Sequence, residues 1–285
     1  MSWLARGLNI FKAIAMVTHK RSWIRPFIIL LVLCAGSSAL AESWQQAKGK
    51  HFIVYFEQKQ DEESAKAVLR EAEKYYDRIS RLIGYARYSD YWTWEERVRI
   101  LVFKDQDSFM KKTHQPPWSM GYADRDSALF SSRVIVTFNQ EQGFLLGLLP
   151  HEIGHLILRD FVGFATFLPL WFEEGVAQLE EIYQKENARK IMKKLARKNQ
   201  YIPLRTLANW DVRSEQDPEK AAVFYAQSVS VVDFLMRHYG STAFANLCRR
   251  LKGEMSFEEV LASTYGQKLK SLEDLERSWV NDLRN

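Results

Sequence analysis

The chain has 285 residues, with 40 basic and 35 acidic side chains and a formal net charge of +5. All of the excess positive charge lies in the first 41 residues, which contain no acidic side chain, so residues 42–285 carry 35 charges of each sign. This balance excludes a charge-based argument for nucleic acid as a partner. Cys248 is the single cysteine after residue 41, so an intramolecular disulfide is excluded there.

The first 41 residues predict a secretory signal peptide. A basic segment precedes an apolar run at 26–36, which is shorter than the roughly 20 residues that a transmembrane helix needs. Residues 39–41, Ala-Leu-Ala, then form a small-x-small cleavage site. We therefore expect residues 1–41 to be removed, leaving Glu42 as the N-terminus of a periplasmic protein. In the alternative, an uncleaved leader anchors the protein in the inner membrane through residues 26–41.

Apolar periodicity along the rest of the chain predicts a fold of the α+β class. The expected strands are 51–57, 98–103 and 133–138, and the expected early helices are 61–82 and 105–112. Residues 113–132 are predicted to be irregular. From Pro169 onward we expect helices over 170–198, 219–238, 241–252, 256–264 and 271–284. The prediction is a small mixed N-terminal sheet with helices, a metal-binding helix, and an all-helical C-terminal lobe.

Residues 151–155 read His-Glu-Ile-Gly-His within an apolar, helix-forming stretch. Positions i and i+4 of a helix share one face, so His151 and His155 can bind one ion together. Glu152 follows the first ligand and can reach a water molecule at an open coordination position. Two imidazoles, one carboxylate and an open position are typical of a catalytic Zn²⁺ site with one ion per chain.

The third ligand must come from farther along the chain. A His-x-x-Gly-x-x-His pattern is excluded because positions 158 and 161 hold Leu158 and Phe161. Glu174 is the best candidate, and Glu173 remains an alternative because helix phase does not separate neighbours at an uncertain helix start. Gly175 favours this segment, since a missing side chain would allow a second helix to approach the metal-binding helix closely.

Together, these motifs resemble the gluzincin metallopeptidases, the clan of thermolysin-like enzymes and zinc aminopeptidases. The resemblance lies in His-Glu-x-x-His, eighteen intervening residues (156–173), and then Glu174 in a Trp-x-x-Glu-Gly-x-Ala segment. The likeness is closest to small bacterial peptidase MA-like domains and covers most of residues 50–285. It implies a thermolysin-like zincin fold in one catalytic domain, 42–285, with Glu174 rather than Glu173 as the zinc ligand.

The same resemblance implies roles for residues outside the zinc motif. A later tyrosine supplies an oxyanion donor in related aminopeptidases, and Tyr225 occupies the matching region. An edge strand that binds substrate backbone is expected at 119–124, with Gly121, Tyr122 and Ala123 as substrate-binding residues. Thermolysin-like enzymes place an aspartate one turn beyond the glutamate ligand to hydrogen-bond the first histidine. Here that position holds Gln178, which brings no charge.

Two functions of different classes follow from the sequence. The first is a zinc metallopeptidase of the bacterial envelope, in which Glu152 acts as general base in the hydrolysis of peptide or protein substrates. The alternative is a non-catalytic module that keeps the zincin fold and binds envelope peptides or proteins. Glu152 favours the enzyme, because a binding module has no use for a base beside the zinc.

Overall fold

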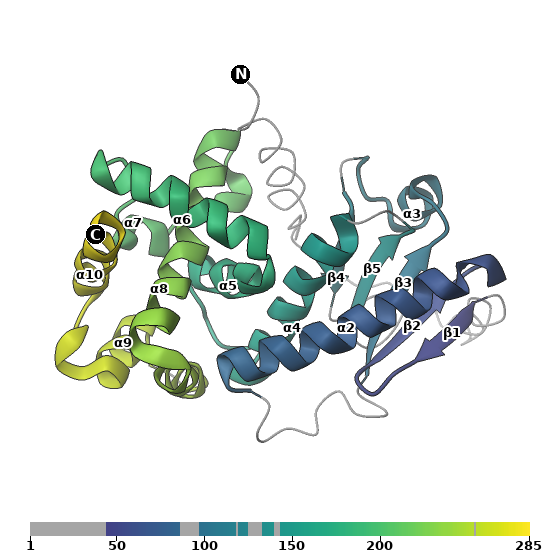
Figure 1. Cartoon of the computed structure of the whole chain (residues 1–285), viewed down its shortest axis with the longest axis horizontal. Helices are drawn as coiled ribbons and strands as arrows, with labels where there is room; N and C mark the ends of the chain where they lie inside the picture. Colours follow the sequence, from purple (N-terminus) through teal and green to yellow (C-terminus); the bar gives the residue numbers. More distant parts are fainter. Residues whose placement is uncertain (1–43, 86–96, 118, 125–132, 140–142, 254) are drawn as a thin grey trace, which may run out of the picture. The chain divides into compact units, whose positions relative to one another are not determined.

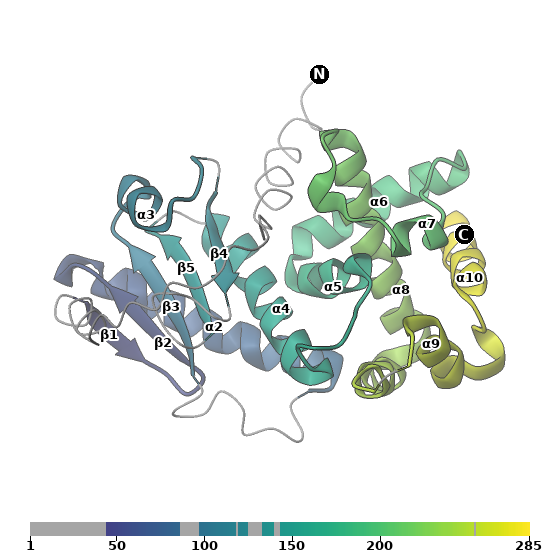
Figure 2. The same cartoon turned by 180° about the vertical axis from the view of Figure 1, so that it is seen from behind.

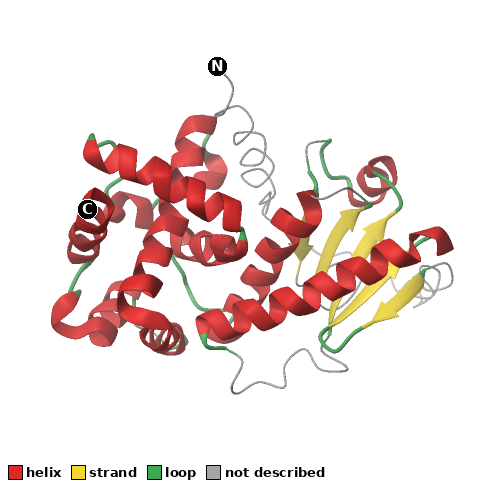
Figure 3. Cartoon of the chain, viewed as in Figure 1, coloured by secondary structure: helices red, strands yellow, loops and turns green. Residues whose placement is uncertain are grey.

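The computed structural model describes residues 44–85, 97–117, 119–124, 133–139, 143–253 and 255–285. Contacts within the chain divide it into two compact units. Of the described residues, the sheet unit comprises 44–73, 97–117, 119–124 and 133–139, and the helical unit comprises 74–85, 143–253 and 255–285. Figure 3 shows that the strands belong to the sheet unit, whereas the helical unit is built from helices and short connections.

The sheet unit contains a five-stranded mixed sheet in the order β1-β2-β3-β5-β4. Its strands are β1 (Gln45–Lys48), β2 (Phe52–Phe56), β3 (Val98–Phe103), β4 (Gly121–Asp124) and β5 (Val134–Phe138). The central strands β2, β3 and β5 are parallel, whereas β1 and β4 pair antiparallel at the two edges. The central strands are nearly continuous apolar runs because both faces of a parallel sheet are buried.

Two helices begin in the sheet unit. The first half of the long helix α2 (Glu62–Ile83), up to residue 73, lies across one face of the sheet, as Figures 1 and 2 show from opposite sides. Helix α3 (Gln106–Thr113) begins at Asp105, whose side chain accepts a hydrogen bond from the Ser108 amide. Its buried Phe109 packs in one apolar cluster with Leu101, Phe103, Val134 and Val136 of the sheet.

The helical unit is organised around the long helix α8 (Pro218–Leu251). Around it lie α4 (Leu149–Val162), α5 (Leu170–Ala177), α6 (Ile182–Arg197), α7 (Leu204–Ala208), α9 (Phe257–Tyr265) and α10 (Leu272–Arg284). Helix α8 is broken at Gly240, whose φ of 84° places it in the left-handed region that glycine tolerates. One wide turn, Phe144–Leu148, leads into α4.

The observed architecture confirms the predicted fold class, a small mixed sheet followed by a mostly helical C-terminal region. Three local predictions need correction. Residues 113–132 are not wholly irregular, because β4 lies within them, and neither β1 nor α7 was predicted. The expected helix over 170–198 is two helices, α5 and α6, separated by a tight turn at Gln178–Glu180 and by Glu181, which has non-helical dihedrals.

The predicted signal peptide lies outside the described residues. Within the described part of the chain, we find no helix with the length and apolar character needed to cross a bilayer. The placement of residues 42–285 in a single catalytic domain stays a prediction. The three proposed ligands and the oxyanion donor fall in the helical unit, whereas Gly121–Ala123 falls in the sheet unit.

Candidate metal centre

Helix α4 places two imidazole rings side by side. His151 and His155 lie one turn apart, with their ring centroids 4.7 Å from one another and the rings nearly perpendicular. The two Nε2 atoms are 3.1 Å apart. The His151 side chain is 4 % exposed and that of His155 is 20 % exposed, so the pair is open on the His155 side.

Helix α5 brings a carboxylate to this pair. Glu174 is buried, and its Oε2 lies 3.6 Å from His151 Nε2 and 3.7 Å from His155 Nε2. Helices α4 and α5 approach closely because Gly154 has no side chain: a Cβ there would lie 2.8 Å from the Cα of Ala177. The structure therefore joins the predicted His-His-Glu set across two helices.

The glycine that allows this approach is not the one expected from the sequence. Gly175 was expected to bring α5 close to the metal-binding helix. In the structure it faces α8 instead, where a Cβ would meet the Ser228 carbonyl oxygen at 2.5 Å and Val232 Cγ2 at 2.6 Å. Gly154 permits the contact of α5 with α4, and Gly175 permits the contact of α5 with α8.

The geometry of the three donors fits a zinc ion. Tetrahedral ligands at about 2.0–2.1 Å from zinc are separated from each other by roughly 3.3 Å. The three observed separations, 3.1, 3.6 and 3.7 Å, lie close to this value. Glu174 Oε2 is buried and makes no hydrogen bond, although a buried carboxylate oxygen without a partner is strongly disfavoured. A cation between the three side chains would provide that partner.

His151 is oriented by a residue that the sequence did not single out. Its Nδ1 lies 2.9 Å from Oε1 of Glu181, which is 2 % exposed. Gln178, the predicted partner, is buried nearby in the chain, but its amide nitrogen makes no hydrogen bond. Gln178 still follows Glu174 at helical spacing, because its backbone amide donates to the Glu174 carbonyl, but it is the turn after it that presents Glu181 to the imidazole.

His155 also faces a second carboxylate. Its Nδ1 lies 3.6 Å from Oε1 of Glu173. Arg159, one turn farther along α4, binds both oxygens of Glu173, with Nε 2.6 Å from Oε1. The adjacent glutamates thus have different surroundings: Glu174 faces the two Nε2 atoms, whereas Glu173 lies against Arg159 and the outer nitrogen of His155.

The carboxylates change the proton affinity of both imidazoles. Burial by itself lowers the pKa of His151, but its hydrogen bond with Glu181 and the charge of Glu174 outweigh burial, and the pKa is raised. Burial likewise opposes the shift at His155, where the charges of Glu174 and Glu173 raise the pKa well above its ordinary value. The pocket therefore stabilises positive charge between these side chains.

The two predicted catalytic residues lie in the same helical unit. Glu152 is buried in α4 beside the first histidine. Tyr225, in α8, is 1 % exposed, and its pKa is raised, first by burial and then by the negative charge of Glu174. Because that charge acts on the phenol, Tyr225 lies near the Glu174 carboxylate, and its hydroxyl keeps its proton at neutral pH.

One ion pair near the centre was not anticipated. Arg213 binds Asp211 through two nitrogens, at 2.6 Å for Nε and 2.7 Å for Nη2. The side-chain hydrogen bond to Asp211 raises the pKa of Arg213, and the charges of Glu174 and Glu173 add to this effect. Nothing in the local sequence marks this pair, because it lies in a short turn whose position is set by α7 and α8.

Gly121, Tyr122 and Ala123 belong to β4, at one edge of the described sheet. Residues 121–124 pair antiparallel with 134–137 of β5. Thr137 also donates its hydroxyl proton to the carbonyl of Met120 over 2.7 Å. Residues 121–124 therefore form an edge strand, as one of the two sequence expectations had it, and not a loop. The role of this strand in substrate binding stays a prediction.

Comparison with known families identifies the chain. A model of the peptidase MA superfamily matches residues 100–282, which span both zinc-motif segments and more than half of the chain. No curated protein matches it. The chain therefore belongs to the peptidase MA superfamily, in agreement with the resemblance found in its sequence. Membership indicates a peptidase, which acts on peptide or protein substrates, and the His151, His155 and Glu174 cluster is compatible with a metal site.

Proposed function

We propose that this member of the peptidase MA superfamily is a zinc-dependent peptidase of the bacterial cell envelope. His151, His155 and Glu174 would hold one zinc ion, leaving a fourth position open. The observation that carries the proposal is the buried, unpartnered Oε2 of Glu174, facing two imidazole nitrogens at distances suited to zinc.

The protein side chains supply the remaining chemistry. Zinc, when bound, polarises the scissile carbonyl and makes water acidic enough to ionise near neutral pH. Glu152 accepts the proton of the attacking water and delivers it to the leaving amine. Glu181 accepts the outer ring proton of His151, and Glu173 lies 3.6 Å from the outer nitrogen of His155, so that each Nε2 lone pair is held toward the centre.

Tyr225 is the proposed donor to the developing oxyanion. Its raised pKa keeps the phenol protonated, which a hydrogen-bond donor requires. The edge strand formed by Gly121–Asp124 is the proposed binding element for substrate backbone, because an extended peptide can add to the edge of a sheet.

The envelope location rests on the leader. Residues 1–41 have the basic segment, apolar run and small-residue site of a secretory signal. We propose export to the periplasm with cleavage after Ala41. Retention in the inner membrane through residues 26–41 is the alternative outcome of the N-terminal analysis described below.

The decisive experiment compares catalysis with binding. Zinc-loaded residues 42–285 are incubated with a peptide library, and products are read by mass spectrometry beside the Glu152→Gln variant and a chelator-treated sample. We expect cleavage by the wild type only, with turnover by Glu152→Gln lower by about a hundredfold or more and its zinc content unchanged. Tyr225→Phe should lower kcat with little effect on KM.

The exposed Glu186 of α6 provides a matched control, because Glu186→Gln makes the same chemical change away from the centre. It should cleave as the wild type does. If the zinc-loaded wild type cleaves no peptide but retains peptides as tightly as Glu152→Gln does, the non-catalytic binding module is the correct account.

A further inference from the structure

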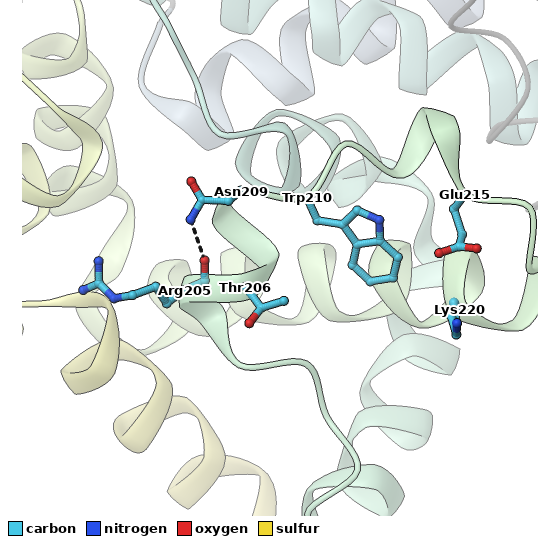
Figure 4. Close-up of a pocket in the computed structure, with 6 residues that line it drawn as sticks. All are labelled: Arg205, Thr206, Asn209, Trp210, Glu215 and Lys220. Atoms are coloured by element: carbon cyan, nitrogen blue, oxygen red, sulfur yellow. Dashed lines mark hydrogen bonds between the residues drawn. The ribbon is translucent and has the colours of Figure 1, made fainter.

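A groove of about 650 Å³ lies in the helical unit, between α7 and the start of α8. This volume falls within the range of roughly 300–1,000 Å³ that is typical of small-ligand sites. Figure 4 shows the six residues that line it: Arg205, Thr206, Asn209, Trp210, Glu215 and Lys220. None of these residues belongs to the metal centre.

The main apolar surface of the groove is the indole of Trp210. One side of the ring packs against Phe224, with the ring centroids 5.8 Å apart and the planes at 79°. Trp210 nevertheless remains partly exposed, and Figure 4 shows its indole between Thr206 and Glu215. An indole that packs against a neighbouring ring and is still partly exposed to solvent can stack with a bulky apolar or aromatic group of a ligand.

The groove is lined by two basic side chains, of which only one is free of ion pairs with the described residues. The Arg205 guanidinium binds Glu273 at 2.6 Å and Glu258 at 2.9 Å, and Figure 4 shows it directed away from Trp210. Lys220 is exposed and makes no ion pair with any residue that the structure describes. Glu215 uses its Oε1 to accept the amide protons of residues 216 and 217. Lys220 is therefore the cation available to an acidic group in the groove.

Residues that flank the groove also contact or influence residues of the metal centre. Phe224, which supports Trp210, packs against the ring of Tyr225 with a centroid distance of 5.5 Å. Trp210 and Glu215 also flank the segment 211–214, whose Arg213 interacts electrostatically with Glu174 and Glu173. Residues that line the groove are therefore only a few positions from Arg213, which is within electrostatic reach of Glu174.

We propose that this groove is a substrate subsite, in which a bulky apolar or aromatic side chain of the peptide stacks on Trp210 and a nearby acidic group of the peptide faces Lys220. The proposal rests on the proposed peptidase function. It predicts a preference for peptides that carry an aromatic and an acidic residue close together on one side of the scissile bond.

The test measures kcat and KM on matched peptides that differ only in carrying Phe-Glu or Ala-Gln at the subsite position. Trp210→Ala should raise KM for the Phe-Glu peptide by about tenfold or more, with little change in kcat, because stacking on Trp210 would be equally strong in the bound substrate and the transition state. Lys220→Glu should raise KM for that peptide as well. Both variants should treat the Ala-Gln peptide nearly as the wild type does.

A further variant, Thr206→Arg, guards against effects on folding. Trp210→Ala removes packing on Phe224, whereas Thr206→Arg obstructs the groove from an exposed position and should raise KM without that loss. Thr242→Arg, also exposed and roughly 30 Å farther along α8, and Lys190→Glu, exposed on α6, are the matched controls. Both controls should keep the wild-type KM.

Peptide binding to the Glu152→Gln variant, followed by fluorescence anisotropy, separates this proposal from the proposed function. If the wild type cleaves peptides while Trp210→Ala, Thr206→Arg and Lys220→Glu all keep its KM and preference, the subsite is overturned and the peptidase stands. If no peptide is cleaved but Thr206→Arg abolishes the binding of the Phe-Glu peptide, the groove is a peptide-binding site, and both the peptidase and the substrate subsite fail.

Discussion

Each histidine of the centre presents one ring nitrogen to Glu174 and the other to a second carboxylate. Glu181 orients His151 from the turn after α5, and Glu173, held by Arg159, faces His155. Outer carboxylates of this kind fix the ring orientation and increase the basicity of the nitrogen that binds the metal. The three glutamates should therefore contribute to zinc affinity in a definite order.

The first prediction is that order. Glu174→Gln removes a ligand and should weaken zinc binding by more than the other two substitutions. Glu181→Gln and Glu173→Gln remove outer partners and should each weaken it by about 10–100-fold. Competition with a chromogenic chelator measures the affinities, and Glu186→Gln is the exposed control. Equal affinities for Glu174→Gln and wild type would remove Glu174 from the ligand set.

The second prediction concerns pH. Zinc binds neutral imidazole, so binding must release any proton that His151 or His155 carries. Because both pKa values in the metal-free protein are raised above the ordinary value of about 6.5, protons compete with zinc even above that pH. Zinc affinity should fall as the pH falls, starting above pH 6.5.

Calorimetry in buffers of different ionisation enthalpy would count the protons released on zinc binding. In Glu181→Gln the pKa of His151 loses the main effect that raises it, so the decline in affinity should move to lower pH. A zinc affinity that stays constant between about pH 8 and 6 would contradict protonation of the two ligands in the metal-free protein.

Residue spacing explains which parts of this centre were predictable. His151 and His155 follow from the i, i+4 geometry of one helix, which needs no tertiary information. Glu181 does not, because its reach to His151 depends on the helix ending at Ala177 and on the turn that follows. Gln178 was expected from the family resemblance, one turn beyond Glu174, but the partner of His151 comes from the turn that follows it.

At the scale of elements, two glycines set the spacing of three helices. Gly154 allows α4 to contact α5 at Ala177, and Gly175 allows α5 to contact α8 at Ser228. These contacts hold Glu174 against the two histidines, on one side through α4 and on the other through α8, which carries Tyr225. The sequence predicted the close approach of α5 to α4 but assigned it to Gly175, which faces α8, rather than to Gly154.

The third prediction tests this packing. Gly175→Ala would place a Cβ 2.5 Å from the backbone oxygen of Ser228, which cannot move without shifting α8. Such overpacking should lower the free energy of unfolding by about 1–3 kcal/mol. Gly147→Ala, in the turn before α4, meets no atom within 4 Å and should be neutral or stabilise by about 0.5–1 kcal/mol.

Denaturant unfolding of the two variants measures the difference, and zinc affinity provides a second measurement. Gly175→Ala should also bind zinc less tightly, because displacement of α5 moves Glu174. Equal stability of Gly175→Ala and Gly147→Ala would show that the α5–α8 contact has room to relax.

The predictability of the elements follows their length and apolar pattern. The buried strands β2, β3 and β5 and the long helix α2 were predicted within about a residue, because their apolar periodicity is strong. The short edge strands β1 and β4 and the helix α7 lack such a pattern. Gly121–Asp124 is extended because it pairs with β5, and that pairing is a tertiary contact.

For the whole molecule, the fourth prediction is export. Residues 1–50 fused to a reporter that is active only in the periplasm should secrete it, because the segment has the parts of a signal peptide. N-terminal sequencing of the mature protein should begin at Glu42. An intact leader found in the membrane fraction would favour the anchored alternative.

The most direct test of the account is the metal content of purified residues 42–285. Three converging protein ligands predict about one zinc per chain after purification without chelators, measured by inductively coupled plasma mass spectrometry. Glu152→Gln should retain that zinc and His155→Ala should lose it, because only the histidine is a proposed ligand. A wild-type protein that carries no zinc, and takes up none when zinc is added, would contradict the proposed centre and the peptidase mechanism built on it.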